Sequence, residues 1–389
     1  MKSFFRLTIS LIFIFAFSFC QTVSTSPYPD RYFDTAETAH KEARLVVFYP
    51  STGTIKALVE LLRQNFLLLD QIEVVGVYHE KELTDYEASK SYVQDNNLNW
   101  FKFHRVTAEL DENALFQRNS CSQEFEDIFK KSDGMIFFGG PDIPPAVYNS
   151  KTSLLTRITD PCRHNLELSF IFHLLGGFQD EDFPAFLDSR PSYPILGICL
   201  GSQSLNVGTG GTLVQDIWSE TYGKVFVEDV IALGQNNWHT NPYARLHPED
   251  STLTPFMLHP VALLEGSKFC TELGFQAGDN PYMLSSHHQG AGRLGKGFRV
   301  AATSLDGKVI EAIEHERFLN VLGVQFHPEY PVLWGTVAKY KFTPQDTPLI
   351  CLKTYLENHP PSFEFHKKIW SWFYGALVHN LVRDREFEL

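Results

Sequence analysis

A cysteine with glycine two positions away on either side is the residue best placed for covalent chemistry. Cys199 lies in GICLGSQ, residues 197–203, directly after the apolar run PILGI. This spacing is typical of a nucleophile elbow, in which a sharp strand-to-helix turn exposes the nucleophile and requires small neighbours. A helix starting after Cys199 would favour its thiolate through the positive end of the helix dipole. We therefore predict a nucleophilic Cys199; a buried structural cysteine in a glycine turn is the alternative.

A histidine and a carboxylate follow a second apolar run. The segment VLGVQF, residues 321–326, ends in His327-Pro328-Glu329. A thiol nucleophile needs a base within reach and a third group that holds the base in one tautomer. His327 as the base and Glu329 as the orienting residue meet both needs. The tripeptide by itself is a weak signal, and a histidine in an exposed turn would be the default interpretation.

Two backbone N–H groups are candidates for stabilising a negatively charged oxygen during the reaction. The first belongs to Leu200, at the start of the helix expected after the cysteine. The second belongs to Gly140 or its neighbour in FFGGPDIPPAVY, residues 137–148, because glycine lets backbone amides face a ligand directly. A simple glycine-proline turn is the alternative for this segment.

Apolar runs alternate with helical segments along the chain. Strands are expected at 45–49, 73–78, 134–140, 194–198 and 321–326, and helices at 58–69, 124–131, 163–175 and 363–382. A hairpin is expected from 298–304 and 309–315. The alternation predicts an α/β fold, namely a single flavodoxin-like three-layer domain with a mostly parallel central sheet and a nucleophile elbow. The carboxyl ends of parallel strands share one edge, where Cys199, His327 and Gly140 should meet.

The N-terminus has the pattern of a secretory signal peptide. Residues 1–20 contain Lys2 and Arg6 and then an apolar run that is too short to span a bilayer comfortably. Cleavage before Cys20 would leave a cysteine for lipid attachment to a membrane, whereas cleavage after it would release the protein. We therefore expect an exported protein that is secreted, periplasmic or lipid-anchored at the cell surface; a buried N-terminal helix is the alternative.

The rest of the chain is expected to form one domain. A polar segment, residues 21–44, precedes the domain at 45–389, and insertions are expected near 176–192, 218–260 and 331–361. The composition, with 43% hydrophobic residues, is sufficient for a substantial core. A net charge of −13 argues against nucleic acid as a partner, because such binding depends on neutralising phosphates.

The remaining cysteines do not indicate a small disulfide-rich scaffold. Cys121, Cys162, Cys270 and Cys351 are widely spaced and could form up to two disulfides in an oxidising compartment. Four ordinary thiols are an equal alternative. No CxxC pair indicates zinc.

The order of motifs resembles a known family. GGPDIPPAVY, DPCRHNLELSF, PILGICLGSQSLNVGTGGTLVQDI, SSHHQGAG and VLGVQFHPEY occur in this order between residues 139 and 330. This order is similar to the γ-glutamyl hydrolase-like branch of the class I glutamine amidotransferases, and most similar to bacterial γ-glutamyl-γ-aminobutyrate hydrolases. The resemblance implies a small γ-glutamyl substrate, a thioester intermediate and no cofactor, and it leaves the oligomeric state open.

The resemblance also assigns residues. Cys199, His327 and Glu329 match the family's triad, and Gly140 and Leu200 match its oxyanion positions, although many relatives have arginine after the cysteine. Substrate contacts are expected from Gln203, His287, His288 and Gln289, with a structural loop role as the alternative for the two histidines. No metal is expected, because adjacent histidines on an extended chain point to opposite faces and no carboxylate or cysteine lies at ligand spacing.

Three further residues and two other functions remain as alternatives. Asn236, Trp238 and His239 lie in an expected insertion, where packing of a loop is favoured over lining a pocket. The chain could instead be a glutaminase that supplies ammonia to a synthetase. It could also be a non-catalytic exported binding protein that keeps the fold.

Overall fold

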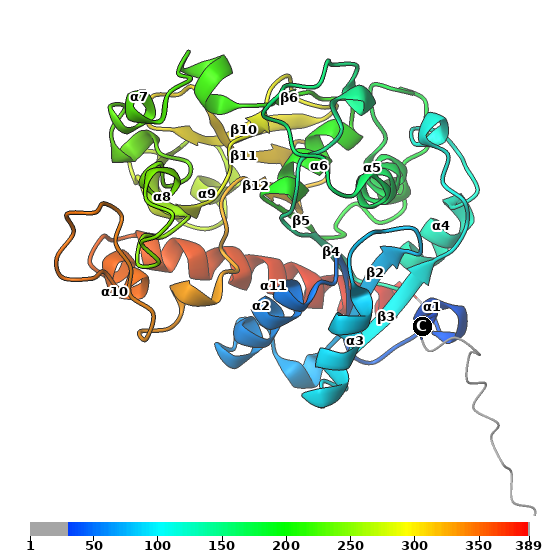
Figure 1. The fold of residues 1–389 in the computed structure, drawn as a ribbon. Helices are drawn as coiled ribbons and strands as arrows, with labels where there is room; N and C mark the ends of the chain where they lie inside the picture. The colour runs from blue at the N-terminus through cyan, green and yellow to red at the C-terminus, as the bar shows by residue number, and fades with distance from the viewer. Residues whose placement is uncertain (1–29, 388–389) are drawn as a thin grey trace, which may run out of the picture.

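The computed structural model describes residues 30–387. A ten-stranded sheet forms the centre of the described part of the molecule (Figure 1). The strand order is β3-β2-β1-β4-β5-β12-β11-β10-β7-β8. The strands are β1 Ala43–Phe48, β2 Ile72–His79, β3 Phe101–Val106, β4 Gly134–Phe137, β5 Ile195–Ile198, β7 Met257–Leu263, β8 Tyr282–Ser285, β10 Phe298–Ser304, β11 Ile310–His315 and β12 Val321–Val324. A second, two-stranded sheet pairs β6 Leu213–Val214 with β9 Gly290–Ala291.

The large sheet has a parallel part and an antiparallel part. The strands from β3 through β12 in the sheet order pair in parallel, whereas β11, β10, β7 and β8 extend the sheet in antiparallel fashion. The α/β class and the mostly parallel sheet predicted from the sequence are therefore confirmed. The hairpin of β10 and β11 is also as predicted.

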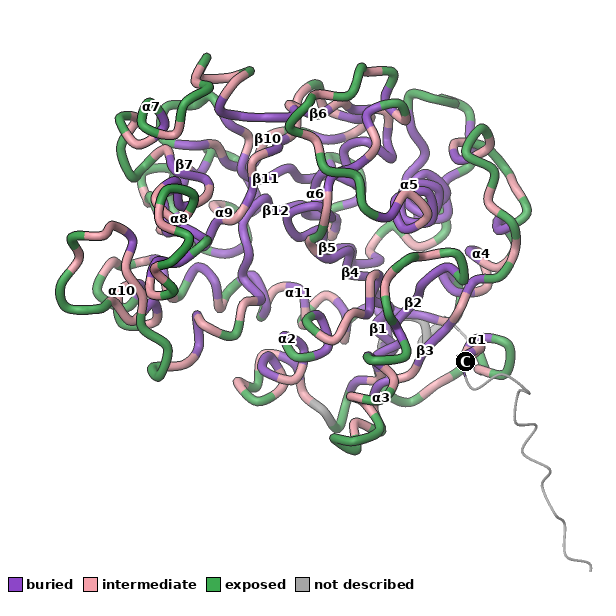
Figure 2. Tube along the Cα trace, viewed as in Figure 1, coloured by how far each residue is buried: buried purple, intermediate pink, exposed green. Residues whose placement is uncertain are grey.

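Helices cover both faces of the sheet (Figure 1). Helices α2 (Thr52–Arg63), α3 (Tyr86–Asp95) and α11 (Ser362–Phe387) contribute to one core layer, and α4 (Ser122–Lys130), α5 (Pro161–Leu175) and α6 (Leu200–Gly208) contribute to the other. The shorter helices are α1 Tyr32–Thr35, α7 Val227–Ile231, α8 Tyr243–Leu246, α9 Lys268–Thr271 and α10 Leu352–Glu357. Helices α5 and α6 are almost entirely buried, whereas exposed residues are concentrated in the peripheral loops (Figure 2).

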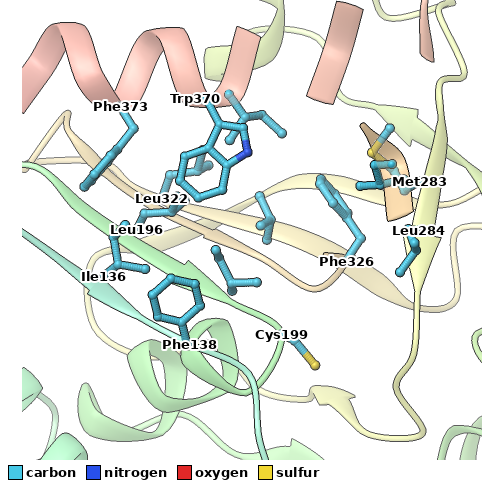
Figure 3. Close-up of a cluster of buried hydrophobic side chains, with 14 of the residues drawn as sticks. Ile136, Phe138, Leu196, Cys199, Met283, Leu284, Leu322, Phe326, Trp370 and Phe373 are labelled. Atoms are coloured by element: carbon cyan, nitrogen blue, oxygen red, sulfur yellow. The ribbon is translucent and has the colours of Figure 1, made fainter. Parts of the chain in front are cut away.

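The apolar core ends at the cysteine. Ile136, Leu196 and Leu322, from three adjacent parallel strands, pack in one cluster with Trp370 and Phe373 of α11. The Cys199 side chain lies at the margin of this cluster, and its sulfur points away from the apolar side chains (Figure 3). The buried core therefore packs against one side of the nucleophile, and the sulfur points away from this core.

The structure differs from the sequence prediction in several elements. Strands β3, β7 and β8 were not predicted, and the last residues assigned to the insertion at 218–260 are the beginning of β7. Helix α2 begins at Thr52, six residues earlier than the prediction at 58, because the Ser51 side chain caps it by accepting a hydrogen bond from the Thr54 N–H. The other insertions, 176–192 and 331–361, contain short helices, turns and isolated β-bridges.

The expected signal peptide, including Cys20, lies outside the described residues. Within residues 30–387, no helix combines the length and the apolar character needed to cross a membrane. Cys121, Cys162, Cys199, Cys270 and Cys351 are free thiols in the structure.

Candidate active site

Cys199 occupies a strained turn between a strand and a helix. Its backbone has φ 53° and ψ −107°, a left-handed conformation that is costly for any residue with a side chain. Strand β5 ends at the preceding residue, and α6 begins at the next. A hydrogen bond of 2.8 Å from the Cys199 N–H to the Val324 carbonyl anchors the turn to β12. The surrounding sheet therefore holds the strained nucleophile-elbow geometry in place.

The flanking glycines are required by close backbone approaches. A β-carbon at Gly197 would lie 2.6 Å from the carbonyl oxygen of Gly201, and one at Gly201 would lie 1.9 Å from the carbonyl oxygen of Phe137. Backbone atoms cannot move aside as a flexible side chain can. These two glycines therefore let α6 pack directly against β5 and β4, which fixes the position of the cysteine between them.

His327 and Glu329 form a buried pair directly after β12. His327 Nδ1 lies 2.7 Å from Glu329 Oε1, and both side chains are almost fully buried. The backbone N–H of His327 donates to the Leu284 carbonyl at 2.8 Å, which ties this turn to β8. The nitrogen bonded to the carboxylate is held in place, so the other ring nitrogen is left for the thiol.

The cysteine and the histidine meet beside Gly139. A β-carbon at this glycine would lie 3.0 Å from His327 Cε1 and 3.5 Å from Cys199 Cβ. Burial alone would lower the pKa of His327, but the Glu329 carboxylate, followed by Cys199 and Tyr330, raises this pKa well above its ordinary value. The site therefore favours a protonated imidazole next to the sulfur, which is the state that stabilises a thiolate.

Replacing Glu329 with glutamine is expected to lower the pKa of His327, because the amide keeps the shape but loses the negative charge. The imidazolium would then deprotonate at a lower pH, so the alkaline limb of the kcat/KM profile should move to lower pH. We expect kcat/KM at neutral pH to fall by about 10²–10⁴-fold. Because the pKa of His327 is raised in the folded state, protonation of this histidine also stabilises the fold. This contribution to the free energy of unfolding is complete below pH ~6.5, the unfolded-state pKa, and is lost as the pH rises through the folded-state pKa.

Glu316→Gln is the matched control for this variant, since Glu316 is exposed and close in sequence. It should leave the pH profile unchanged. An alkaline limb that stays in place in Glu329→Gln would contradict the role assigned to the carboxylate.

A cavity of about 470 Å³ opens onto the sulfur and the imidazole. It is lined by Tyr49, Ser51, Gly53, Thr54, Ala57, Phe138, Gly139, Gly140, Cys199, Ser286, His327, Glu329, Tyr330 and Pro331. None of the described lining residues is lysine or arginine. Ser51, Gly53 and Thr54 of this wall belong to the start of α2, where the N–H groups of Thr52 and Gly53 have no intrahelical acceptor, so the wall lies at the positive end of the helix dipole.

The predicted oxyanion groups lie on two sides of the cysteine. Leu200 is the first residue of α6, where a backbone N–H has no intrahelical acceptor. Gly140 lines the cavity, and a β-carbon there would lie 1.9 Å from the guanidinium of Arg163. Arg163 donates to the carbonyls of Phe138 and Gly139 at 2.8 and 3.1 Å. The buried guanidinium therefore stabilises the conformation of the glycine segment.

Sequence reasoning assigned no role to Arg163 or to Tyr49. The guanidinium carbon of Arg163 lies 3.7 Å from the centre of the Tyr49 ring, and its Nε donates to Glu167 at 2.7 Å. Tyr49 has φ 59°, an unusual value for a residue with a side chain, and it lines the cavity at the end of β1. The available signal was its position at the carboxyl end of a predicted parallel strand, followed by Pro50.

Gln203 and Gln289 are buried next to the site, and their contact with substrate stays a prediction. Gln203 donates to the Gln289 carbonyl at 3.3 Å and to the Gln325 side chain at 3.2 Å. Gln325 in turn lies 3.7 Å from the Cys199 sulfur through its side-chain nitrogen. The Gln289 side chain donates to the Gln215 carbonyl. Neither Gln203 nor Gln289 lines the cavity; their observed contacts support the cysteine and the adjoining loop.

The two adjacent histidines have different surroundings, and neither lines the cavity; Ser286 is the residue of this segment that does. His288 lies 3.2 Å from Asp142 and 3.4 Å from Asp216. Burial opposes protonation of His288, but these two carboxylates raise its pKa to about 9. His287 points into a separate buried cluster with His239, His259 and Glu311. Direct substrate contact by either histidine therefore stays a prediction.

For His287, the argument against a metal was incomplete. It considered spacing along the chain, whereas the fold brings a carboxylate and two histidines to His287 from other elements. Burial lowers the pKa of His259 to about 4 and also lowers that of His287, so both rings are neutral near pH 7. Of the other residues considered for a pocket, Trp238 packs in its loop with its ring N–H donating to the Val230 carbonyl, and Asn236 is exposed.

Cysteine hydrolases and amidotransferases have a cysteine on such a strand-to-helix turn of an α/β sheet, and the cysteine faces a histidine–glutamate pair. This chain is of that class. It belongs to the Peptidase C26 family, whose sequence profile matches residues 74–329. The matched range includes Cys199, His327 and Glu329, and it confirms the resemblance to class I glutamine amidotransferase-like proteins.

Individual relatives agree with this assignment. The chain is 31% identical over 227 residues to the glutamine amidotransferase-like protein YvdE of Lactococcus lactis, covering 58% of this chain and 78% of YvdE. It is 28% identical over 230 residues to the glutamine amidotransferase-like protein RP404 of Rickettsia prowazekii, covering 55% of this chain and 75% of RP404. A solved glutamine amidotransferase from Thermotoga maritima aligns over 88% of this chain and 99% of its own, with 12% identity and a TM-score of 0.35.

Proposed function

We propose that this protein hydrolyses γ-glutamyl amide bonds, with Cys199 as nucleophile, His327 as the acid–base group and Glu329 as the residue that orients the imidazole. The observation that carries the proposal is that the strained cysteine and the buried histidine–glutamate pair border one cavity. Membership of the Peptidase C26 family supports an enzyme of the hydrolase kind.

The geometry supports a two-step reaction. In the first step the Cys199 thiolate attacks the side-chain carbonyl carbon of the glutamyl group, and the N–H groups of Leu200 and the Gly139–Gly140 segment stabilise the oxyanion. The imidazolium of His327 then protonates the leaving amine as the C–N bond breaks. In the second step His327 takes a proton from water, the hydroxide attacks the thioester, and glutamate leaves as the C–S bond breaks.

The cavity wall also supports an anionic substrate. A γ-glutamyl group carries a free α-carboxylate, and no basic side chain lines the described cavity wall. The first turn of α2 would attract this carboxylate through its N–H groups, which is the usual behaviour of a helix N-terminus toward anions. The volume of about 470 Å³ suits a glutamyl group with a small amine.

We further propose that the substrate is met outside the cytosol, as a small γ-glutamyl peptide, a polyglutamate or a cell-wall fragment. This rests on the signal-like residues 1–20, with Cys20 as a site for lipid attachment. Mass determination of the mature N-terminus from the native host would test it. A mature protein that retains residues 1–20 would contradict export and would favour a cytosolic glutaminase.

The activity itself is tested with the mature protein and a panel of γ-glutamyl amides, matched α-glutamyl isomers and free glutamine. Mass spectrometry would follow the released amine and glutamate, and acid quenching would trap a glutamyl group on Cys199. Turnover of γ-glutamyl but not α-glutamyl compounds is the expected result. Turnover of glutamine alone would favour the glutaminase alternative, and no turnover with no trapped acyl group would contradict the proposal.

A further inference from the structure

Four buried side chains that could bind a metal converge beside the candidate active site. His239 lies in the loop before α8, His259 in β7, His287 in the loop after β8 and Glu311 in β11. Their exposed fractions are 0%, 0%, 4% and 0%. One ligand atom from each residue can be chosen so that all four atoms lie within 4.8 Å of one another. Segments far apart in the sequence therefore bring these four groups together.

The separations are close to those of a metal's coordination shell. Glu311 Oε1 lies 3.0 Å from His239 Nδ1 and 3.8 Å from His259 Nε2, and Glu311 Oε2 lies 3.6 Å from His287 Nε2. Ligand atoms around a tetrahedral zinc ion with bonds of about 2.0–2.2 Å are about 3.3–3.6 Å apart. Small side-chain adjustments would place all four atoms at bonding distance.

The hydrogen bonds around the cluster leave its inward-facing atoms available as metal ligands. The rings of His287 and His259 each contact a backbone carbonyl through Nδ1, at Gln289 and Pro260, with distances of 2.8 and 3.2 Å. This arrangement leaves Nε2 with a lone pair, as in histidines that bind metals. The atoms that face the cluster centre have no hydrogen bond of acceptable geometry: His259 Nε2, His287 Nε2, His239 Nδ1 and both oxygens of Glu311.

The buried charge of Glu311 also favours binding of a cation. Glu311 is fully buried, so its carboxylate needs a positively charged partner. Among the described residues, the ion-pair partners of this carboxylate are the three histidines, and none is a lysine or an arginine. A buried carboxylate with no lysine or arginine beside it is costly, and a bound divalent cation would remove that cost.

We propose that His239, His259, His287 and Glu311 bind one divalent transition-metal ion of the zinc type. Imidazole and carboxylate ligands in a four-coordinate arrangement suit zinc. The site is closed, since four protein ligands complete the coordination and the cluster is buried. A closed site of this kind has a structural role, and the metal takes no part in the chemistry at Cys199.

The metal would link the insertion that contains His239, and the cavity wall at Ser286, to the central sheet. His239 belongs to the segment between β6 and β7, and its carbonyl accepts hydrogen bonds from the His287 N–H at 3.1 Å and the Ser285 hydroxyl at 3.0 Å. Ser286, between these two residues, lines the cavity. Glu311 is bonded through its carbonyl to the N–H of Gln325, two residues before His327. Metal binding would therefore stabilise the frame around the site.

The first test is metal analysis of the full mature chain, produced with a tag that does not bind metals and purified without chelators. Elemental mass spectrometry should find about one zinc per chain. Removing the metal with a strong chelator should lower the Tm by about 5–10 °C, and zinc chloride alone should restore it. Cobalt(II) in place of zinc should give the intense visible absorption of a tetrahedral site.

Variants separate this site from adventitious binding. His259→Gln and Glu311→Gln should each lose the metal and the Tm response to zinc. His366→Gln is the matched control, because His366 is also fully buried and bonded to a backbone carbonyl through Nδ1 but lies outside the cluster; it should retain both. The proposal is overturned if wild-type protein holds no metal and its Tm does not respond to zinc, cobalt, manganese, iron or nickel, or if the cluster variants bind metal as the control does.

Discussion

Cys199→Ala is expected to reduce hydrolysis of a γ-glutamyl amide by about 10⁴-fold or more, because no other group at the site can form the thioester. The cavity, the oxyanion N–H groups and the imidazole all remain, so substrate binding should change little. Single-turnover kinetics should show no acyl-enzyme, and the Tm should stay close to that of the wild type. The loss therefore reports on chemistry and not on folding.

Cys270→Ala is the matched control for this experiment. Cys270 is also a free thiol, and it does not line the cavity. Its replacement should leave kcat/KM unchanged. A thiol-reactive probe should label Cys199 in the native protein, and labelling should stop the reaction. Equal activity of Cys199→Ala and the wild type would remove Cys199 from the mechanism, and a native Cys199 that resists the probe would favour a binding protein that keeps the fold.

Gly201→Ala is expected to have the second-largest effect, although it adds only one carbon atom. Its β-carbon would lie 1.9 Å from the Phe137 carbonyl oxygen and 2.6 Å from the carbonyl carbon. Because both atoms belong to the backbone of β4, α6 must move away from the sheet. We expect the free energy of unfolding to fall by about 3 kcal/mol or more, measured by denaturant titration.

The same movement displaces Cys199 from the imidazole, so activity should fall even in the fraction that folds. Gly375→Ala is the control, since Gly375 is an exposed helical glycine of α11 with no atom within 4 Å of an added β-carbon. It should raise stability by up to about 1 kcal/mol through helix propensity. Unfolding curves of Gly201→Ala and wild type that coincide would show that the turn tolerates a side chain.

Local sequence pattern was sufficient for the parallel half of the sheet. The runs at 45–49 and 74–78 are continuously apolar because these parts of β1 and β2 are buried on both faces, and such runs are recognisable without tertiary information. Strand β3, with the sequence FKFHRV, was missed because basic residues interrupt its pattern. Strands β7 and β8 lie in the antiparallel extension, whose position depends on partners distant in the sequence.

The sequence by itself determined the cysteine turn, the histidine–glutamate pair and their shared edge of the sheet, because each of these depends on short spacing or on the regular geometry of parallel strands. Only the tertiary structure decided that Tyr49 and the start of α2 line the cavity, and that His287 faces His239, His259 and Glu311. Those groups come from separate elements, and their meeting is set by the packing of the antiparallel strands and an insertion, which leaves no local pattern in the chain.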